Sequence, residues 1–176
     1  MKASLPIKDI EMIQKMKDLF LSKGEIRGYL LFVLSINTGI YLKDLLELKV
    51  RDVKNKQYLT IGKNKVVPLN DEIQGVIKKA IGGCKLDDPL FQGKIGQRLD
   101  RTSAFYIFKI ICTELGVQDK YSVLSWRKTF AYHYYMKYKD ISYLMWLFNQ
   151  RSVEQALKFI GVEENMNLRF REGVCL

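Results

Sequence analysis

The sequence contains a single histidine, His133, and only three cysteines, Cys84, Cys112 and Cys175. The cysteines lie far apart and form no Cys-x-x-Cys pair, which argues against a structural zinc site with its four clustered sulfur and nitrogen ligands. Their odd number and wide spacing also argue against a disulfide framework. We therefore expect reduced thiols, no metal ion and no cofactor.

Long apolar segments are missing as well. The longest, Tyr29–Ile36, is interrupted only by Ser35 and is far shorter than the ~20 residues that a transmembrane helix needs. The N-terminus is polar and charged, which does not fit a secretory signal peptide. These absences predict a cytoplasmic protein that does not associate with a membrane.

The composition is that of a globular protein with a basic surplus. The chain has 176 residues, of which 48% are hydrophobic and 27% charged, and this length suits one domain with a substantial core. Its 29 Lys and Arg residues outnumber its 19 Asp and Glu residues, which gives a net charge of +10. Such a surplus favours a polyanionic partner, most simply nucleic acid, although solubility alone also explains it.

Apolar residues recur with helical spacing along most of the chain. Ile10, Ile13, Met16 and Phe20 predict an amphipathic helix that ends near Gly24. The segment 26–36 is apolar almost all round, which predicts a buried helix. Further helices are predicted at about 42–48, 73–81, 102–115, 124–138, 141–148 and 152–160, the last with Ser152 and Gln155 spaced as a capping box.

One short region has strand character instead. Residues 57–61 and 66–69 are rich in β-branched and aromatic residues, and the turn between them contains Lys63 and Lys65. This pattern predicts a β-hairpin with a lysine-rich tip. Lysines in a turn usually only keep it solvated, but a cationic hairpin above a bound anion is the alternative. The predicted fold class is therefore mostly α with a small β-hairpin.

Arg127 lies on an unusual helix face. Phe130, Ala131 and Tyr134 follow it at three, four and seven positions, so its own face is otherwise apolar. A guanidinium there needs an anion, because an unpaired buried charge is costly. An internal salt bridge or a side chain extended to solvent would meet that need. A bound phosphate is the alternative.

Phe159 lies at the border of the apolar face of the last helix. Val153, Ala156, Leu157 and Ile160 define that face, and Phe159 falls beside it. Packing at the edge of the core explains such a position. The alternative is that Phe159 stands where a functional side chain once pointed into a cleft.

Read together, these segments resemble the tyrosine recombinase (phage integrase) family. Residues 37–45 resemble its TGxRxxE box, and 62–69 its lysine-bearing β-hairpin. Residues 124–131, LSWRKTFA, are similar to its HxLRHTFA box, and 147–152 resemble its LLGHSS segment. Residues 156–159 fall where the nucleophilic tyrosine is expected. Each box alone is unspecific, but their order and spacing between about residues 26 and 160 are together specific.

The resemblance implies the mostly helical catalytic-domain fold of that family, with its small β-element beside the active-site cleft. We expect one such domain over residues 1–176, with a C-terminal tail at 161–176. The separate N-terminal core-binding domain of the family has no counterpart in this sequence. The chain is thus expected to be either a fragment of a longer protein or a stand-alone domain.

Against the family pattern, the catalytic positions are degenerate. The family surrounds the scissile phosphate with two arginines, a lysine and two histidines, one often a tryptophan, and attacks it with a tyrosine. By register, Tyr41 replaces the first arginine, Leu124 the first histidine and Gln150 the second histidine or tryptophan. Phe159 replaces the tyrosine, and phenylalanine has no oxygen with which to attack phosphorus.

Three positions of the family pattern remain. They are Asp44, the hairpin lysine Lys63 and the second arginine, Arg127. The hairpin is shorter than usual in the family, so Lys65 is an alternative for Lys63. The resemblance thus implies a fold that is kept and a reaction that is lost.

These features predict a non-catalytic protein that binds double-stranded DNA, as a regulator or repressor from a phage or other mobile element. It would act in the cytoplasm of a bacterial host cell, on the nucleoid when bound. The residues expected to contact DNA are Arg127, Lys63, Lys65, Lys128 and Arg51.

Two other classes of function stay open. The first is an active integrase that uses a partner's tyrosine or a displaced one, for which the candidates are Tyr132, Tyr134, Tyr135, Tyr138 and Tyr143. The second is a protein-interaction module that docks its last helix on a recombinase-like partner. A homo-oligomer formed through the last helix and the tail is also expected to be possible.

Overall fold

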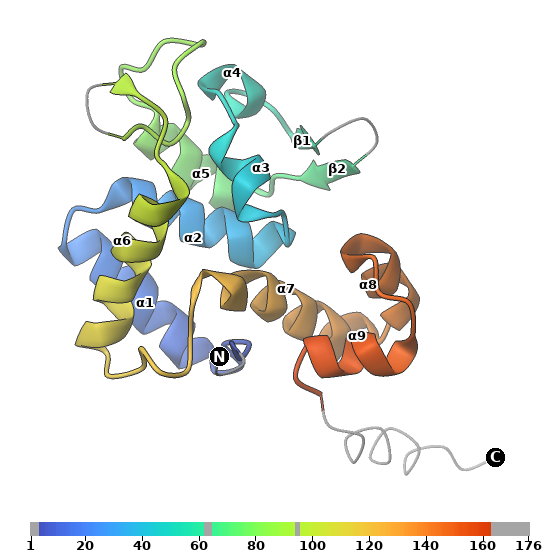
Figure 1. Cartoon of the computed structure of the whole chain (residues 1–176). Coiled ribbons are helices and arrows are strands. Elements are labelled where there is room, and N and C mark those ends of the chain that lie inside the picture. Colours follow the sequence, from blue (N-terminus) through green and yellow to red (C-terminus); the bar gives the residue numbers. More distant parts are fainter. Residues whose placement is uncertain (1–3, 62–64, 94–95, 163–176) are drawn as a thin grey trace.

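The computed structural model describes residues 4–61, 65–93 and 96–162, with only the backbone of Lys65 (Figure 1). The expected fold class is confirmed, because helices dominate and one two-stranded antiparallel sheet accompanies them. The helices are α1 (Ile10–Ser22), α2 (Ile26–Thr38), α3 (Leu42–Leu46), α4 (Val50–Val53), α5 (Asp71–Ala80), α6 (Arg101–Glu114), α7 (Val123–Tyr138), α8 (Ile141–Phe148) and α9 (Val153–Phe159).

Most helix bounds agree with the predictions to within a few residues. The exception is α4, which was not predicted, since a helix of four residues shows too few positions for a helical period. The predicted capping box of α9 forms only in part. The Ser152 hydroxyl accepts a hydrogen bond from the Gln155 N–H, but the Gln155 side chain accepts one from the Arg151 N–H instead of that of Ser152.

The predicted hairpin is confirmed in its strands. In β1 (Tyr58–Ile61) and β2 (Lys65–Pro68), Leu59 pairs with Val67, and the Leu59 side chain is buried. The predicted lysine-rich tip lies outside the described residues, as do Lys63 and the Lys65 side chain.

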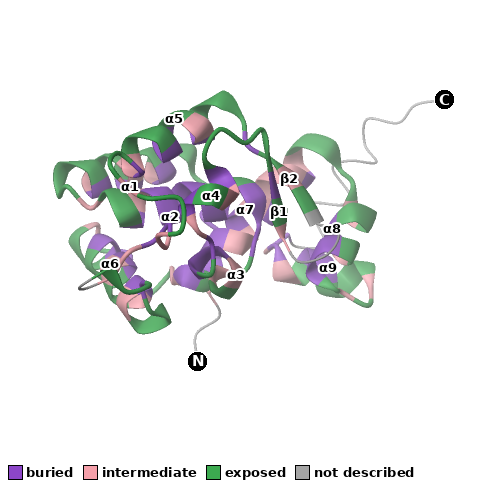
Figure 2. Cartoon of the chain, turned by 90° about the horizontal axis from the view of Figure 1, so that it is seen from above, coloured by how far each residue is buried: buried purple, intermediate pink, exposed green. Residues whose placement is uncertain are grey.

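The main core surrounds α2, whose residues Leu30–Leu34 are all buried, as its uniformly apolar sequence predicts. Phe32 lies 5.8 Å from Trp126 of α7 and 6.1 Å from Phe108 of α6, measured between ring centroids. Figure 2 shows buried parts of α2 and α7 near the centre of the molecule, with exposed helix faces around them. Aromatic packing thus fixes α7 against α2 and α6.

A second, smaller core joins the later part of α7 to α8 and α9. Ala131 and Tyr135 of α7 are buried here together with Leu144 and Leu147 of α8 and Leu157 of α9. In Figure 1, α8 and α9 accordingly lie to one side of the main body, and α7 runs from the body to them. Helix α7 therefore begins in one core and ends in the other, with Arg127 at the junction.

Gly39 ends α2 and brings it close to α7. Its φ angle is +66°, in the left-handed region that glycine adopts without strain. A Cβ atom at this position would come within 2.6 Å of the Phe130 ring. The short turn after Gly39 leads directly to Tyr41, which brings the first family box against the helix that carries Arg127.

Among the described residues, no helix is both long and apolar enough to cross a bilayer.

Candidate nucleic-acid interface

Arg127 is half-buried between two aromatic rings. Its guanidinium carbon lies 3.3 Å from the centroid of the Tyr41 ring and 4.6 Å from that of Phe148. Its Nε donates a hydrogen bond of 2.8 Å to the carbonyl of Gly39. Burial lowers the pKa of Arg127, and the Tyr41 side chain and the Asp44 charge oppose this shift. The guanidinium is therefore held in place by rings and a carbonyl.

The salt bridge that would explain Arg127 as an internal ion pair is not formed. In the described part of the chain, no carboxylate oxygen lies within 4.0 Å of its guanidinium nitrogens, Asp44 included. An arginine carries five N–H donors, and the bond to Gly39 takes one of them. The remaining N–H donors of Arg127 are therefore able to bind an anion.

Two clefts meet at Tyr41 and Arg127. The hairpin-side cleft has a volume of about 40 Å³ and lies between the turn after α2, the hairpin and α8. It is lined by Thr38, Gly39, Ile40, Tyr41, Asp44, Ile61, Val66, Val67, Arg127, Tyr143, Trp146 and Leu147. The α6-side cleft has a volume of about 140 Å³ and lies between α3, α6 and the start of α7. It is lined by Ser35, Ile40, Tyr41, Leu42, Lys43, Arg101, Phe105, Val123, Leu124, Trp126 and Arg127.

Two of the degenerate family positions lie in these clefts. Tyr41 and Leu124 both line the α6-side cleft beside Arg127, with 36% and 52% of their surface exposed. The positions of the first arginine, the first histidine and the second arginine thus converge, as the sequence register predicts. Their chemistry differs, because an aromatic ring and an aliphatic chain stand where cationic groups are expected.

Gln150 and Phe159 line neither cleft. Gln150 follows α8, and its N–H donates to the carbonyl of Met145. Phe159 is half-buried, and its ring centroid lies 5.1 Å from that of Phe148. The edge-packing interpretation fits this position, with the Phe148 ring contacting both Phe159 and the guanidinium of Arg127.

Lys128 and Arg51, which were also predicted to contact DNA, have other partners and do not face the Arg127 clefts. The Lys128 ammonium donates a hydrogen bond of 2.7 Å to the carbonyl of Ser4 and lies over the Phe159 ring, and burial lowers the pKa of Lys128. Arg51 forms an ion pair of 2.8 Å with Asp87. Neither residue lines a cleft that contains Arg127.

Two cations of the α6-side cleft were missed by the sequence analysis, Lys43 and Arg101. Lys43 is two residues beyond Tyr41 within the first family box, so its position was a usable signal. Arg101 is the first residue of α6, and no motif includes it. Only the tertiary structure places it beside Lys43 and Arg127.

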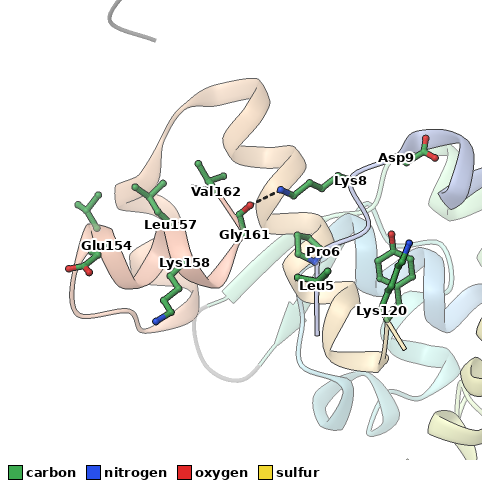
Figure 3. Close-up of a pocket in the computed structure, with 12 residues that line it drawn as sticks. Leu5, Pro6, Lys8, Asp9, Lys120, Glu154, Leu157, Lys158, Gly161 and Val162 are labelled. Atoms are coloured by element: carbon green, nitrogen blue, oxygen red, sulfur yellow. Dashed lines mark hydrogen bonds between the residues drawn. The ribbon is translucent and has the colours of Figure 1, made fainter. Parts of the chain in front are cut away.

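A larger groove, of about 1020 Å³, lies between the N-terminal segment and α9 (Figure 3). The Lys8 ammonium donates a hydrogen bond of 2.7 Å to the carbonyl of Gly161 along one side of it. Leu5, Pro6 and Leu157 supply apolar surface. The groove shares no lining residue with the two clefts and contains none of the family positions, so size alone does not make it the functional site.

Within the described ranges, no group of three or more His, Cys, Asp or Glu side chains is placed to hold a metal ion.

Comparison with known proteins assigns the family. The model of the phage integrase family matches residues 5–165. The chain is also 30% identical over 167 residues to the probable integrase/recombinase YoeC of Bacillus subtilis (strain 168), and covers 91% of each protein. The chain therefore belongs to the phage integrase family, whose members are tyrosine recombinases.

Solved structures of recombinases share the fold. The XerA recombinase superposes with a TM-score of 0.77 at 16% identity, over 98% of this chain and 64% of that one. The XerH recombinase bound to its palindromic difH substrate gives 0.74 at 18% identity, over 98% of this chain and 54% of that one. The chain thus spans between about half and two thirds of these recombinases, and the predicted catalytic-domain fold is confirmed.

Proposed function

We propose that this protein binds double-stranded DNA at the Arg127 clefts and does not cleave it. The observation that carries the proposal is the half-buried guanidinium of Arg127, which lines both clefts and has no described carboxylate partner within 4.0 Å. A cation withdrawn from water is stabilised by an anion. The net charge of +10 and the membership in a family of DNA recombinases support a phosphodiester as that anion.

The loss of cleavage is proposed on chemical grounds. Phe159 has no hydroxyl with which to form a bond to phosphorus, and it lines neither cleft. Tyr41 and Leu124 supply no positive charge to the phosphate. By analogy with a single oxyanion donor, each missing clamp removes about 3 kcal/mol of transition-state stabilisation.

A regulatory role follows from binding without cleavage. A domain that occupies recombinase-type sites without cutting them would block or modulate other proteins there. We propose a regulator or repressor from a phage or mobile element, acting in the cytoplasm of a bacterial cell and on its nucleoid when bound. The proposal treats residues 1–176 as one catalytic-type domain.

One observation favours a second candidate, an active recombinase with a displaced nucleophile. Tyr143 lines the hairpin-side cleft together with Arg127. Its hydroxyl oxygen would bond to phosphorus as the bond between phosphorus and a sugar oxygen breaks, and the phenol proton would pass to the leaving sugar oxygen. Burial, followed by the nearby Asp140 charge, raises the pKa of Tyr143, which keeps the hydroxyl neutral and makes it a weak nucleophile.

The groove beside α9 offers a surface for self-association. Val153 of α9 is 48% exposed and lines this groove together with the charged residues Lys8, Glu154 and Lys158. We propose that a homo-oligomer, if it forms, uses α9 and the segment after it. Light scattering on the protein alone and with DNA tests this, since a monomeric mass in both states would contradict it.

The proposed function is tested with a labelled mixed-sequence duplex and a nicked suicide duplex. We expect reversible, salt-sensitive binding of the first and no denaturant-resistant adduct with the second. An adduct that disappears in Tyr143→Phe would establish the second candidate. Absence of binding even at low salt would favour a protein-interaction module.

A further inference from the structure

We propose that Lys43 and Arg101 bind backbone phosphate together with Arg127 in the α6-side cleft, and so replace the charge that the family's first arginine and first histidine supply. The inference rests on the proposed function and deepens it. It names two contact residues, neither of which belongs to the positions kept from the family pattern.

Three cations from different helices converge on the α6-side cleft. Lys43 comes from α3, Arg101 from the first turn of α6 and Arg127 from α7, and all three line the same cleft of about 140 Å³. No Asp or Glu side chain lines this cleft among the described residues. Three positive charges around one concave surface attract an anion strongly, because a cleft with low-dielectric walls focuses their field.

Lys43 and Arg101 have aromatic rings as neighbours and no carboxylate partner within the described structure. Lys43 lies over the Tyr41 ring, with its ammonium 5.9 Å from the centroid, and the Arg101 guanidinium lies 5.5 Å from the centroid of Phe105. Neither forms an ion pair within 4.0 Å in the described part of the chain, whereas Arg51 pairs with Asp87. Rings that hold cations without neutralising them leave the charges available to phosphate oxygens.

The cleft lining also contains two unsatisfied hydrogen-bond donors. Ser35 and Trp126 line it, and their Oγ and Nε1 atoms are buried without a hydrogen-bond partner in the described structure. Buried polar groups are rarely left unpaired. A phosphate oxygen, or a water bound to it, that reached these two donors would satisfy them.

Exposed apolar surface in the cleft fits the same ligand. Leu124 and Tyr41 are 52% and 36% exposed, which leaves apolar contacts for the sugar rings that flank a phosphate. The ligand is therefore a phosphodiester of the duplex backbone, contacted without reading the base sequence.

The test is the salt dependence of binding to a mixed-sequence duplex. Each phosphate contact contributes about 0.9 to the magnitude of the log–log slope. We expect the double variant Lys43→Gln/Arg101→Gln to lower that magnitude by about 2. Both side chains are exposed and neither takes part in a hydrogen bond within the described structure, so the variant should keep its melting temperature.

The matched control is Lys78→Gln/Lys79→Gln, which removes the same charge from the exposed face at the end of α5, outside both clefts. It should leave the slope close to that of the wild type. If the cleft variant behaves like this control while Arg127→Ala weakens binding, the inference is wrong and the proposed function stands. If the wild type shows no salt-dependent binding, both are wrong.

Discussion

The Tyr41 ring lies flat against the charge of Arg127, with 3.3 Å between the ring centroid and the guanidinium carbon. By the sequence register, Tyr41 falls where the family has its first arginine and Arg127 where it has its second. At Arg127 an aromatic ring therefore takes the place where the register predicts a second positive charge. A cation over a partly desolvated ring is stabilised by about 1–2 kcal/mol. This relationship accounts for a half-buried arginine that has no carboxylate partner within the described structure.

The contact between the Tyr41 ring and the Arg127 guanidinium predicts that Tyr41 stabilises the fold. We expect Tyr41→Leu to lower the free energy of unfolding by about 1–2 kcal/mol, because the aliphatic side chain cannot attract the guanidinium. Urea denaturation measures it. Tyr58→Leu is the control, since Tyr58 is an exposed tyrosine on β1 that lines neither cleft. Equal losses of unfolding free energy in the two variants would show that the Tyr41–Arg127 contact does not stabilise the protein.

Restoring the hydroxyl at position 159 is not expected to restore strand cleavage. In Phe159→Tyr the side chain would still lie at the edge of the second core, and Tyr41, Leu124 and Gln150 would still leave the phosphate without its clamp and acid–base groups. Incubation with a nicked suicide duplex, followed by denaturing electrophoresis, measures the covalent adduct. Efficient adduct formation by the single variant would mean that the other positions matter less than proposed.

DNA affinity is expected to fall steeply with salt. Phosphate contacts by Lys and Arg release counterions from the duplex, and a handful of contacts gives a log–log slope with a magnitude of at least ~3. Fluorescence anisotropy over a range of salt concentrations measures this slope. A flat response would contradict an interface built from the cations of the Arg127 clefts.

Substitution of Gly39 is expected to destabilise the protein. Gly39→Ala would strain a left-handed backbone and push a Cβ atom to 2.6 Å from Phe130, which together should reduce the free energy of unfolding by about 2–4 kcal/mol. Gly83→Ala separates the two effects, because Gly83 also has a positive φ angle but nothing within 4 Å of the added Cβ. Comparable losses in the two variants would argue against tight packing of the α2–α3 turn on α7.

Much of the fold could be predicted from local sequence patterns. The apolar period of α1, the uniformly apolar α2 and the paired strands are local signals, and Gly24 and Gly116 adopt positive φ angles at the predicted helix ends. The short helix α4 escaped prediction because four residues carry no period.

The site was only partly accessible from sequence. The motif register assigns Tyr41, Leu124 and Arg127 to one site, and all three line the α6-side cleft although Tyr41 lies far from the other two in the sequence. It did not reveal that aromatic rings replace an ion pair at Arg127, nor that the Lys128 ammonium binds the Ser4 carbonyl. Arg101 was missed for the same reason, since contacts between distant segments depend on how the helices pack.

The most direct test of the account is Arg127→Ala, with DNA affinity and melting temperature measured on the same sample. If Arg127 holds a backbone phosphate, the folded variant should bind duplexes of any sequence more weakly by about 1–3 kcal/mol, as for loss of a charged hydrogen-bond partner. Its melting temperature should fall only by the amount that loss of the Tyr41 and Phe148 ring contacts and of the Gly39 hydrogen bond explains. A destabilised variant whose folded fraction binds DNA as tightly as the wild type would contradict the phosphate role.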